Sequence, residues 1–267
     1  MLAFFQDAWN ILAEYREFLL RGVGYTMLLA LVGTVAGLLI GLITGIIRTI
    51  PASRNKCTAV IQKIINILIS VYVEIFRGTP MMVQAMVIYW GYAFASGGKT
   101  LPLIGAGMLI VSINTGAYMA EIVRGGILSI DRGQTEGAVS IGMNHFQVMV
   151  YVILPQVMRN ILPSVSNEFV INIKDTSVLN VIGVTELYYF AGVIKRDNFK
   201  TFQTYLVVCI IYFILTFAIT RLLRLFEKML TGSKDYTICG SQSDHNAEIR
   251  VSSETREEKE IAKNDRL

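Results

Sequence analysis

The chain contains five apolar segments that are each long enough to cross the hydrocarbon core of a lipid bilayer. That core is about 30 Å thick, so a spanning helix needs about 20 mostly apolar residues. Lipid offers backbone groups no hydrogen-bond partners, and such segments therefore fold as helices. The five segments are Tyr25–Ile47, Ile64–Phe94, Leu103–Val123, Ser164–Val184 and Tyr205–Leu223. The sequence predicts an all-α membrane protein with five transmembrane helices.

The positions of basic residues predict how these helices are oriented. The loop Arg48–Lys63 and the segment Arg221–Lys228 are both rich in Lys and Arg. An excess of these residues is typical of cytoplasmic loops. We therefore expect the N-terminus outside and the C-terminus in the cytoplasm, in a multi-pass protein of the cytoplasmic membrane.

The distribution of polar residues divides the chain into three parts. Residues 1–24 look like an amphipathic segment and lack the basic start of a cleaved signal peptide. Residues 25–230 form one transmembrane domain. Residues 231–267 are polar, mixed in charge and poor in aromatics. This last composition predicts a disordered cytoplasmic tail.

Composition also argues against several functions. The chain is 53% hydrophobic with a formal net charge of +4, and its basic residues form no patch interleaved with aromatics, so nucleic-acid binding is not expected. The scattered Cys57, Cys209 and Cys239 indicate neither a disulfide framework nor a metal site. Ser96–Thr100 resembles the end of a phosphate-binding loop but lacks the first glycine and a preceding strand. We expect no catalytic residues, metal or cofactor in this chain.

Glycines and a proline mark special positions in the first two spans. Gly33, Gly37, Gly41 and Gly45 recur every four residues and predict a face on which another helix packs closely. The second segment would be about 46 Å long as one helix, and Gly78–Pro80 interrupts it. Interrupted helices of transporters often lie beside the substrate path, whereas a tilted, kinked helix is the alternative.

Two pairs of opposite charges lie three residues apart within spans. Glu74 and Arg77 can pair near the interruption, and Glu121 and Arg124 can pair near the cytoplasmic end of the third span. A structural ion pair is the favoured interpretation of the second.

The fourth span carries ionisable residues near its centre. Glu168, Asn172 and Asp175 follow one another at i, i+4 and i+7, which places them on one helix face. Each buried charge costs about 2.5–3.5 kcal/mol on insertion scales, so such groups face a cavity or a partner. One interpretation is two ion pairs with other helices. The other is a site for a zwitterion, in which Asp175 attracts an ammonium and Lys174 a carboxylate.

A less apolar stretch, Asp131–Pro155, separates the third and fourth spans. It predicts two short helices that form a bent knob at the membrane surface. The first covers Gln134–Ile141 and ends at Gly142 in the left-handed conformation. Asn144 caps the second helix, with Gln147 completing an approximate capping box.

The second short helix should have one apolar face and should end before the fourth span. Pro155 follows it, and Pro163 closes the approach to the next span. The residues expected on the apolar face are Phe146, Met149, Val150 and Ile153.

The same stretch resembles a known family. Glu136-Gly137-Ala138, Gly142 and Val152-Ile153-Leu154-Pro155 resemble the EAA loop of ABC importer permeases in residue type and spacing, with Gly137 in place of Ala and Val152 in place of Ile. In that family the loop is the coupling helix that docks on a separate ATP-hydrolysing subunit. The coupling residues that the resemblance implies are Glu136, Gly137, Ala138, Gly142 and Pro155.

Three further runs are similar to the polar amino acid branch of these permeases. They are Val73–Pro80 with Gln84, Asn114–Glu121, and Lys174–Ser177. The resemblance of the last run implies a substrate-lining position. The substrate-binding residues expected from the run and from the polar stripe are Lys174, Asp175, Thr176, Ser177, Glu168 and Asn172.

Together these resemblances imply the permease subunit of an ATP-driven importer that moves a polar amino acid by alternating access. A glutamine-like substrate is expected, with a basic amino acid as the alternative because Glu168 adds a second acid. The implied partners are two ATP-binding subunits that hold ATP and Mg²⁺, a second permease subunit of the same or a related kind, and an extracytoplasmic solute-binding protein. An ion- or proton-coupled transporter or channel that uses Lys174, Asp175 and Glu168, and a membrane scaffold, are the alternatives.

Overall fold

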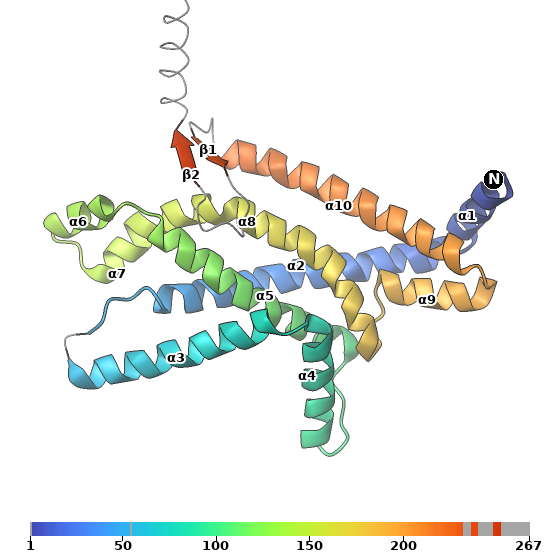
Figure 1. The fold of residues 1–267 in the computed structure, drawn as a ribbon, viewed down its shortest axis with the longest axis horizontal. Helices are drawn as coiled ribbons and strands as arrows, with labels where there is room; N and C mark the ends of the chain where they lie inside the picture. Colours follow the sequence, from blue (N-terminus) through green and yellow to red (C-terminus); the bar gives the residue numbers. More distant parts are fainter. Residues whose placement is uncertain (1, 54, 232–235, 240–247, 252–267) are drawn as a thin grey trace, which may run out of the picture. The chain divides into compact units, whose positions relative to one another are not determined.

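The computed structural model describes residues 2–53, 55–231, 236–239 and 248–251. Two compact units are present, one up to Leu223 and one from Arg224 onward. The first unit contains only helices among its described residues (Figure 1). Their bounds are α1 Leu2–Glu14, α2 Arg16–Ile47, α3 Lys56–Gly78, α4 Met81–Ala95, α5 Leu103–Leu128, α6 Arg132–Ser140, α7 His145–Gln147, α8 Leu154–Asp175, α9 Leu187–Asn198 and α10 Thr201–Thr231.

Five helical stretches of the described chain are long and apolar enough to cross a membrane, which confirms the predicted number of spans. They are Arg16–Ile47, Lys56–Gly78, Leu103–Leu128, His145–Ile182 and Thr201–Met229. The first begins nine residues before the expected start at Tyr25, so part of the predicted N-terminal segment belongs to a span. The outside position of the N-terminus stays a prediction.

The glycines of α2 pack against α5, and this is the most extensive helix pair in the structure. A Cβ atom at Gly37 would lie 2.8 Å from Cβ of Thr115, and one at Gly41 would lie 2.7 Å from the carbonyl carbon of Met119. Such distances are too short for a side chain, so only glycine lets the two backbones come this close. The predicted packing face is confirmed, and its partner helix belongs to the same chain.

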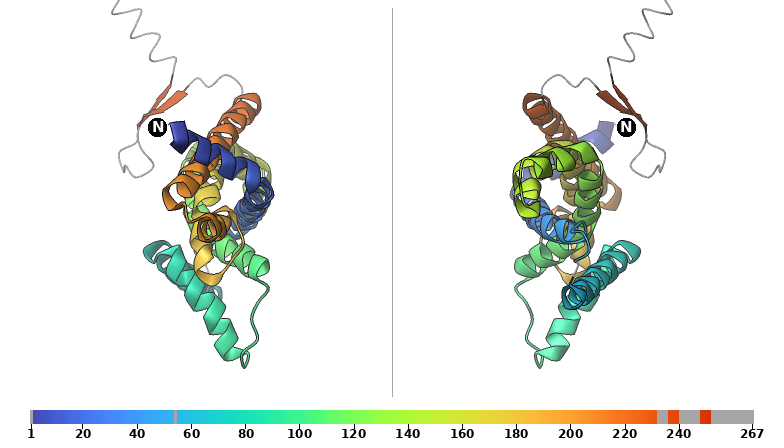
Figure 2. Two further views of the ribbon diagram at one scale, coloured as in Figure 1. Left: turned by 90° about the vertical axis from the view of Figure 1, so that its right-hand side faces the viewer. Right: turned by 90° about the vertical axis from the view of Figure 1, so that its left-hand side faces the viewer.

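The second apolar segment is broken, as predicted, into α3 and α4. Thr79 and Pro80 separate the two helices, and α4 runs in a different direction from α3 (Figures 1 and 2). Gln84 lies just beyond the break, and its amide donates hydrogen bonds of 2.9 Å to the carbonyl oxygens of Phe76 and Thr79. Asn114 of α5 donates to Gln84 Oε1 at 2.8 Å. These side chains replace the helical partners that the break removes.

The stretch from His145 to Ile182 is one continuous helical path, which corrects the expectation of a separate second short helix. A π-helical segment, Val148–Ile153, joins α7 to α8, and a 3-10 segment, Thr176–Ile182, follows α8. Pro155 stands in the first turn of α8, directly after the π-helical segment, and Pro163 lies inside the helix. The wider turn before Pro155 lets the chain continue without a stop.

The π-helical segment also shifts the buried face of this path. Val148 and Ile153, five residues apart, are both buried with Val157 and Ile161, whereas Phe146 is 73% exposed. Phe146, a member of the predicted apolar face, therefore lies apart from these buried residues. The prediction assumed 3.6 residues per turn, and the π-helical turn contains more.

The N-terminal helix is amphipathic and is held to the end of α9 and to the link between α9 and α10. Ile11 and Tyr15 are buried, while Trp9 is exposed. The Tyr15 hydroxyl donates to Asp197 at 2.5 Å, and Lys200 Nζ lies 2.6 Å from an Asp7 carboxylate oxygen.

The predicted tail contains two short described segments beyond α10, and its predicted disorder stays a prediction. The two segments form two antiparallel strands, β1 Tyr236–Cys239 and β2 Glu248–Val251, with Tyr236 opposite Val251. The rest of the predicted tail lies outside the described residues.

Candidate translocation and coupling sites

The polar stripe of α8 divides into an inward part and an outward part. Asn172 is only 3% exposed. Its amide donates to Thr34 Oγ1 of α2 at 2.8 Å, and its carbonyl accepts from Thr115 Oγ1 of α5 at 3.1 Å. Thr176 is also buried and donates to the carbonyl of Ile173. Both residues therefore bind within the subunit and not on its outer face.

Lys174 and Asp175 instead lie on the exposed side of α8, and Glu168 and Ser177 are partly exposed. The depth of these charged residues follows from their neighbour Asn172. Asn172 bonds to Thr34 and Thr115, which stand near the middle of α2 and α5. Asp175 is less than one helical turn farther along the chain. These charges therefore lie near the middle of the helix bundle.

Arg77 joins this cluster from another helix, and sequence reasoning did not assign it to the site. It lies in the last turn of α3, just before the break, and its positive charge acts on Glu168. Its guanidinium carbon lies 5.6 Å from the centre of the Tyr118 ring of α5. The signal that was available is its position beside Gly78–Pro80, in a run similar to polar amino acid permeases.

The two predicted charge pairs have different outcomes. Glu74 and Arg77 form no ion pair in the described chain. Arg77 instead lies over the ring of Tyr118. The pair of Glu121 with Arg124 is confirmed, with nitrogen–oxygen distances of 2.9 and 3.0 Å.

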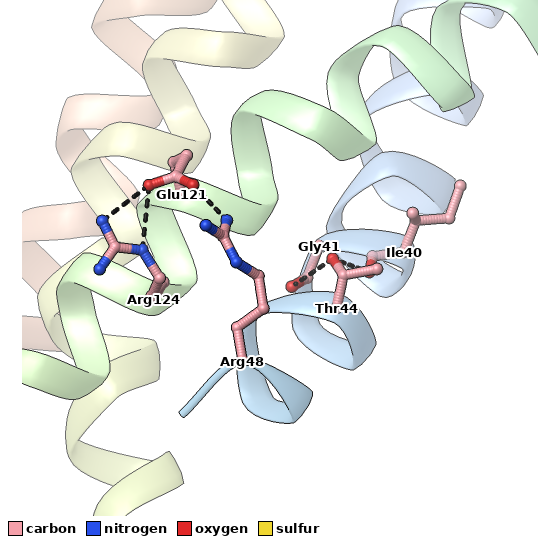
Figure 3. A network of polar contacts seen from close by, with 6 residues as sticks. All are labelled: Ile40, Gly41, Thr44, Arg48, Glu121 and Arg124. Carbon is pink, nitrogen blue, oxygen red and sulfur yellow. Dashed lines mark hydrogen bonds and ion pairs between the residues drawn. The ribbon is translucent and has the colours of Figure 1, made fainter. Parts of the chain in front are cut away.

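Glu121 has a second cationic partner that sequence spacing does not reveal. Arg48, directly after α2, forms an ion pair with the other carboxylate oxygen of Glu121 (Figure 3). One turn earlier, the Thr44 hydroxyl donates to the carbonyl of Ile40 at 2.8 Å. The ends of α2 and α5 that lie toward α6 are thus joined by a two-arginine clamp on one carboxylate.

The predicted coupling knob begins with α6. The Asp131 side chain caps this helix by accepting from the Gly133 N–H at 2.7 Å. Gly142 has a φ of 89°, which confirms the left-handed turn predicted there. Asn144 and Gln147 form the predicted capping box, with both hydrogen bonds at 2.9 Å. Local chemistry therefore fixes the angle between α6 and α7.

The surface of the knob is suited to contact with another protein. Glu136 and Gly137 are exposed, and Ala138 is buried against the base of the knob. Pro155 is exposed at the start of α8. The large apolar side chains left exposed along the knob, from α6 to the π-helical segment, are Val139, Ile141, Phe146 and Tyr151. Exposed apolar groups gathered in this way are typical of interaction sites.

Comparison of the sequence with known proteins finds similar amino-acid permeases. The glutamine transport system permease protein GlnP of Escherichia coli (strain K12) is 34% identical over 225 residues, covering 84% of this chain and 98% of that protein. The probable amino-acid permease protein YxeN of Bacillus subtilis (strain 168) is 33% identical, covering 85% and 97%.

Solved structures share the fold. A crystal structure of an amino acid ABC transporter with histidines matches with a TM-score of 0.70 and 35% identity, covering 82% of this chain and 96% of that one. An inward-facing structure of the MetNI methionine ABC transporter matches with a TM-score of 0.60 at 18% identity, covering 79% and 97%. The second likeness concerns the fold alone.

The family assignment rests on most of the chain. The sequence model of the family described as "binding-protein-dependent transport system inner membrane component" matches residues 37–232. Such components are non-catalytic, multi-pass proteins of the cytoplasmic membrane that work with an ATP-binding subunit and a substrate-binding protein. The chain belongs to this family, the membrane-spanning permease subunits of ABC importers.

Proposed function

We propose that this permease subunit carries a polar amino acid, glutamine or a close analogue, through a path that passes the charged cluster on α8. The observation that carries the proposal is the gathering of Lys174, Asp175, Glu168 and Arg77 near mid-bundle, on the open side of the subunit. The similarity to glutamine permeases supports the same substrate class.

The cluster has the charges that a zwitterion requires. Asp175 and Glu168 supply acids for an ammonium group, while Lys174 and Arg77 supply cations for a carboxylate. An amide side chain adds no charge, so glutamine leaves the cluster balanced. A basic amino acid is the second candidate, since two carboxylates lie on the same helix face.

The cluster also supports assembly with a second permease subunit. Charged groups near mid-membrane depth are costly in lipid and face a cavity or a partner. Here they lie on the outside of one subunit, so a second copy or a related subunit must cover them and enclose the path between the two. Two permease subunits then place two knobs on the cytoplasmic side, and each docks one ATP-binding subunit that holds ATP and Mg²⁺.

The knob links ATP hydrolysis in the ATP-binding subunit to movement of the transport path. Val148, Ile153 and Val157 bury one side of the knob and of α8 in the same apolar cluster. Because α7, the π-helical segment and α8 are continuous, a movement of the knob is transmitted to the helix that carries Asp175. An ion-coupled carrier, the alternative function, needs no such docking surface.

A ligand screen on the assembled complex tests the substrate. The permease is purified with its ATP-binding subunit and solute-binding protein, and ATP hydrolysis is measured with each of the twenty amino acids in turn. We expect glutamine to stimulate hydrolysis most. Stimulation by arginine or lysine alone would select the basic alternative, and hydrolysis that no amino acid changes would contradict the proposal.

A further inference from the structure

One face of α3 is polar although the helix is long and apolar enough to span a membrane. Asn66, Ser70 and Glu74 follow at i, i+4 and i+8, and Arg77 falls on the same side. We call these four residues the α3 polar face. The opposite side carries Leu68, which is 63% exposed. The predicted Glu74–Arg77 pair on this face does not form within the described chain.

Two open grooves run along the α3 polar face and meet at Ser70 and Glu74. The first lies between α3 and the loop that follows α2. The second continues to the end of α3 and is closed on its other side by Tyr118, Arg48 and Glu121. Its volume of about 500 Å³ lies within the range of small-molecule sites, roughly 300–1,000 Å³.

Polar atoms in these grooves lack partners within the described part of the chain. The Asn66 Oδ1 atom is buried and accepts no hydrogen bond, and the Glu74 carboxylate forms no ion pair. Gln62, by contrast, donates to the carbonyl of Ile50 at 2.8 Å and holds the loop onto α3. Glu74 is exposed, and an exposed carboxylate without an ion-pair partner is costly in lipid unless it meets water or a ligand. Lipid is therefore an unsuitable neighbour for this face.

The grooves extend from the α8 cluster to the loop between α2 and α3. At one end, Arg77 lies near Glu168 of the α8 cluster. At the other, the first groove ends at Ile50 and Ala52, in the loop between α2 and α3. This loop follows the end of α2 that Arg48 ties to α5, the end that lies toward α6.

We infer that the α3 polar face lines the route by which the amino acid leaves the α8 cluster toward the ATPase side. Arg77 receives the substrate's carboxylate from Lys174. Glu74, one helical turn closer to the ATPase side, receives the substrate's ammonium group. Ser70 and Asn66 then supply neutral hydrogen-bond partners that hold the substrate weakly enough to release it. This inference rests on the proposed function and names the residues that line the release part of the transport path.

The test measures which side of α3 meets water and substrate. Single cysteines replace Ser70 (Ser70→Cys) and Leu68 (Leu68→Cys), two positions at similar depth on opposite sides of α3. Both are made in a chain whose Cys57, Cys209 and Cys239 are Ser. Each variant complex, with its ATP-binding subunits, is placed in lipid nanodiscs and treated with a cationic, water-soluble methanethiosulfonate reagent. Only a hydrated thiol ionises and reacts.

We expect Ser70→Cys to react at least about tenfold faster than Leu68→Cys, since the second thiol meets lipid. Millimolar glutamine should slow the reaction of Ser70→Cys and leave that of Leu68→Cys unchanged. Equal rates, or a faster reaction at Leu68→Cys, would overturn the inference. So would fast labelling of Ser70→Cys that glutamine does not slow in a complex that transports glutamine.

A separate measurement keeps failure of the proposed function apart from failure of this route. The cysteine-free complex in proteoliposomes is tested for ATP-dependent uptake of glutamine. Loss of glutamine uptake in this complex would contradict the proposed substrate. The ratio of the two labelling rates decides separately whether the α3 polar face is in contact with water.

Discussion

Asn172 of α8 donates a hydrogen bond of 2.8 Å to the hydroxyl of Thr34 on α2, although 138 positions separate the two residues. With the bond from Thr115 of α5, this contact ties three helices together at the middle of the bundle. One turn away, Asp175 points to the open side of the same helix. The polar stripe of α8 therefore combines a structural residue with residues of the transport path.

Replacing Asn172 tests the structural part. Asn172→Ala leaves the buried hydroxyl of Thr115 without its acceptor, so we expect a loss of about 1–2 kcal/mol in stability. The midpoint of thermal denaturation of the purified complex in detergent should fall, and exposed Asn180→Ala serves as the control. An unchanged midpoint combined with lost transport would instead place Asn172 in the substrate path.

Replacing Asp175 tests the transport part. In the described chain its carboxylate forms no ion pair, so Asp175→Ala should assemble normally. We expect uptake to fall at least tenfold, a loss of about 1.4 kcal/mol in substrate stabilisation. Asp175→Glu keeps the charge and should retain part of the uptake. A complex that fails to assemble would indicate a broken ion pair, which costs about 3–5 kcal/mol.

The close contact of α2 with α5 predicts a strict size limit at Gly41. The added methyl group of Gly41→Ala would overlap Cβ of Met119, and the helices would have to separate. We expect a loss of about 1–3 kcal/mol and a lower yield of monodisperse complex in size-exclusion chromatography. Gly24→Ala on the same helix, where the added group meets nothing within 4 Å, is the matched control. Equal yields would contradict the importance of this seam.

Gly142 should control coupling to the ATPase without affecting the spans. Valine is strained at a φ of 89° by about 1–2 kcal/mol, which is enough to change the angle between α6 and α7. In Gly142→Val, we expect substrate-stimulated hydrolysis and uptake to fall together, while the solute-binding protein still docks. Glu136→Lys should act similarly by reversing a charge on the exposed face of α6.

The control for Gly142→Val is a glycine with the same backbone conformation at a distant place. Gly98, between α4 and α5, has a φ of 94° and open space around it. Gly98→Val introduces similar strain away from the knob and should leave coupling unchanged. Wild-type stimulation in both Gly142→Val and Glu136→Lys would show that the knob is not the coupling element.

The sequence predicted those features that depend on neighbouring residues. The break at Gly78–Pro80, the turn at Gly142 and the cap at Asn144 all follow from local backbone chemistry, and the structure confirms each. The five spans follow from length and apolarity. The glycine seam predicted close packing, whereas its partner α5 became evident only from tertiary contacts.

Other features depend on contacts between distant parts of the chain or on irregular helix geometry. The continuous path through Pro155 was missed because a π-helical turn leaves no distinct pattern in the sequence. The burial of Asn172 depends on Thr34 and Thr115, and the second arginine on Glu121 comes from another helix. Helical spacing alone showed which residues share a face but not which part of that face is covered.

The most direct test of the account is what drives uptake. The permease, ATP-binding subunit and solute-binding protein are reconstituted in proteoliposomes, and entry of labelled glutamine is measured with ATP or with an ion or proton gradient. We expect glutamine accumulation to require ATP, to persist when all ion gradients are collapsed, and to be lost in Gly142→Val. Accumulation driven by an ion gradient without ATP would contradict the account.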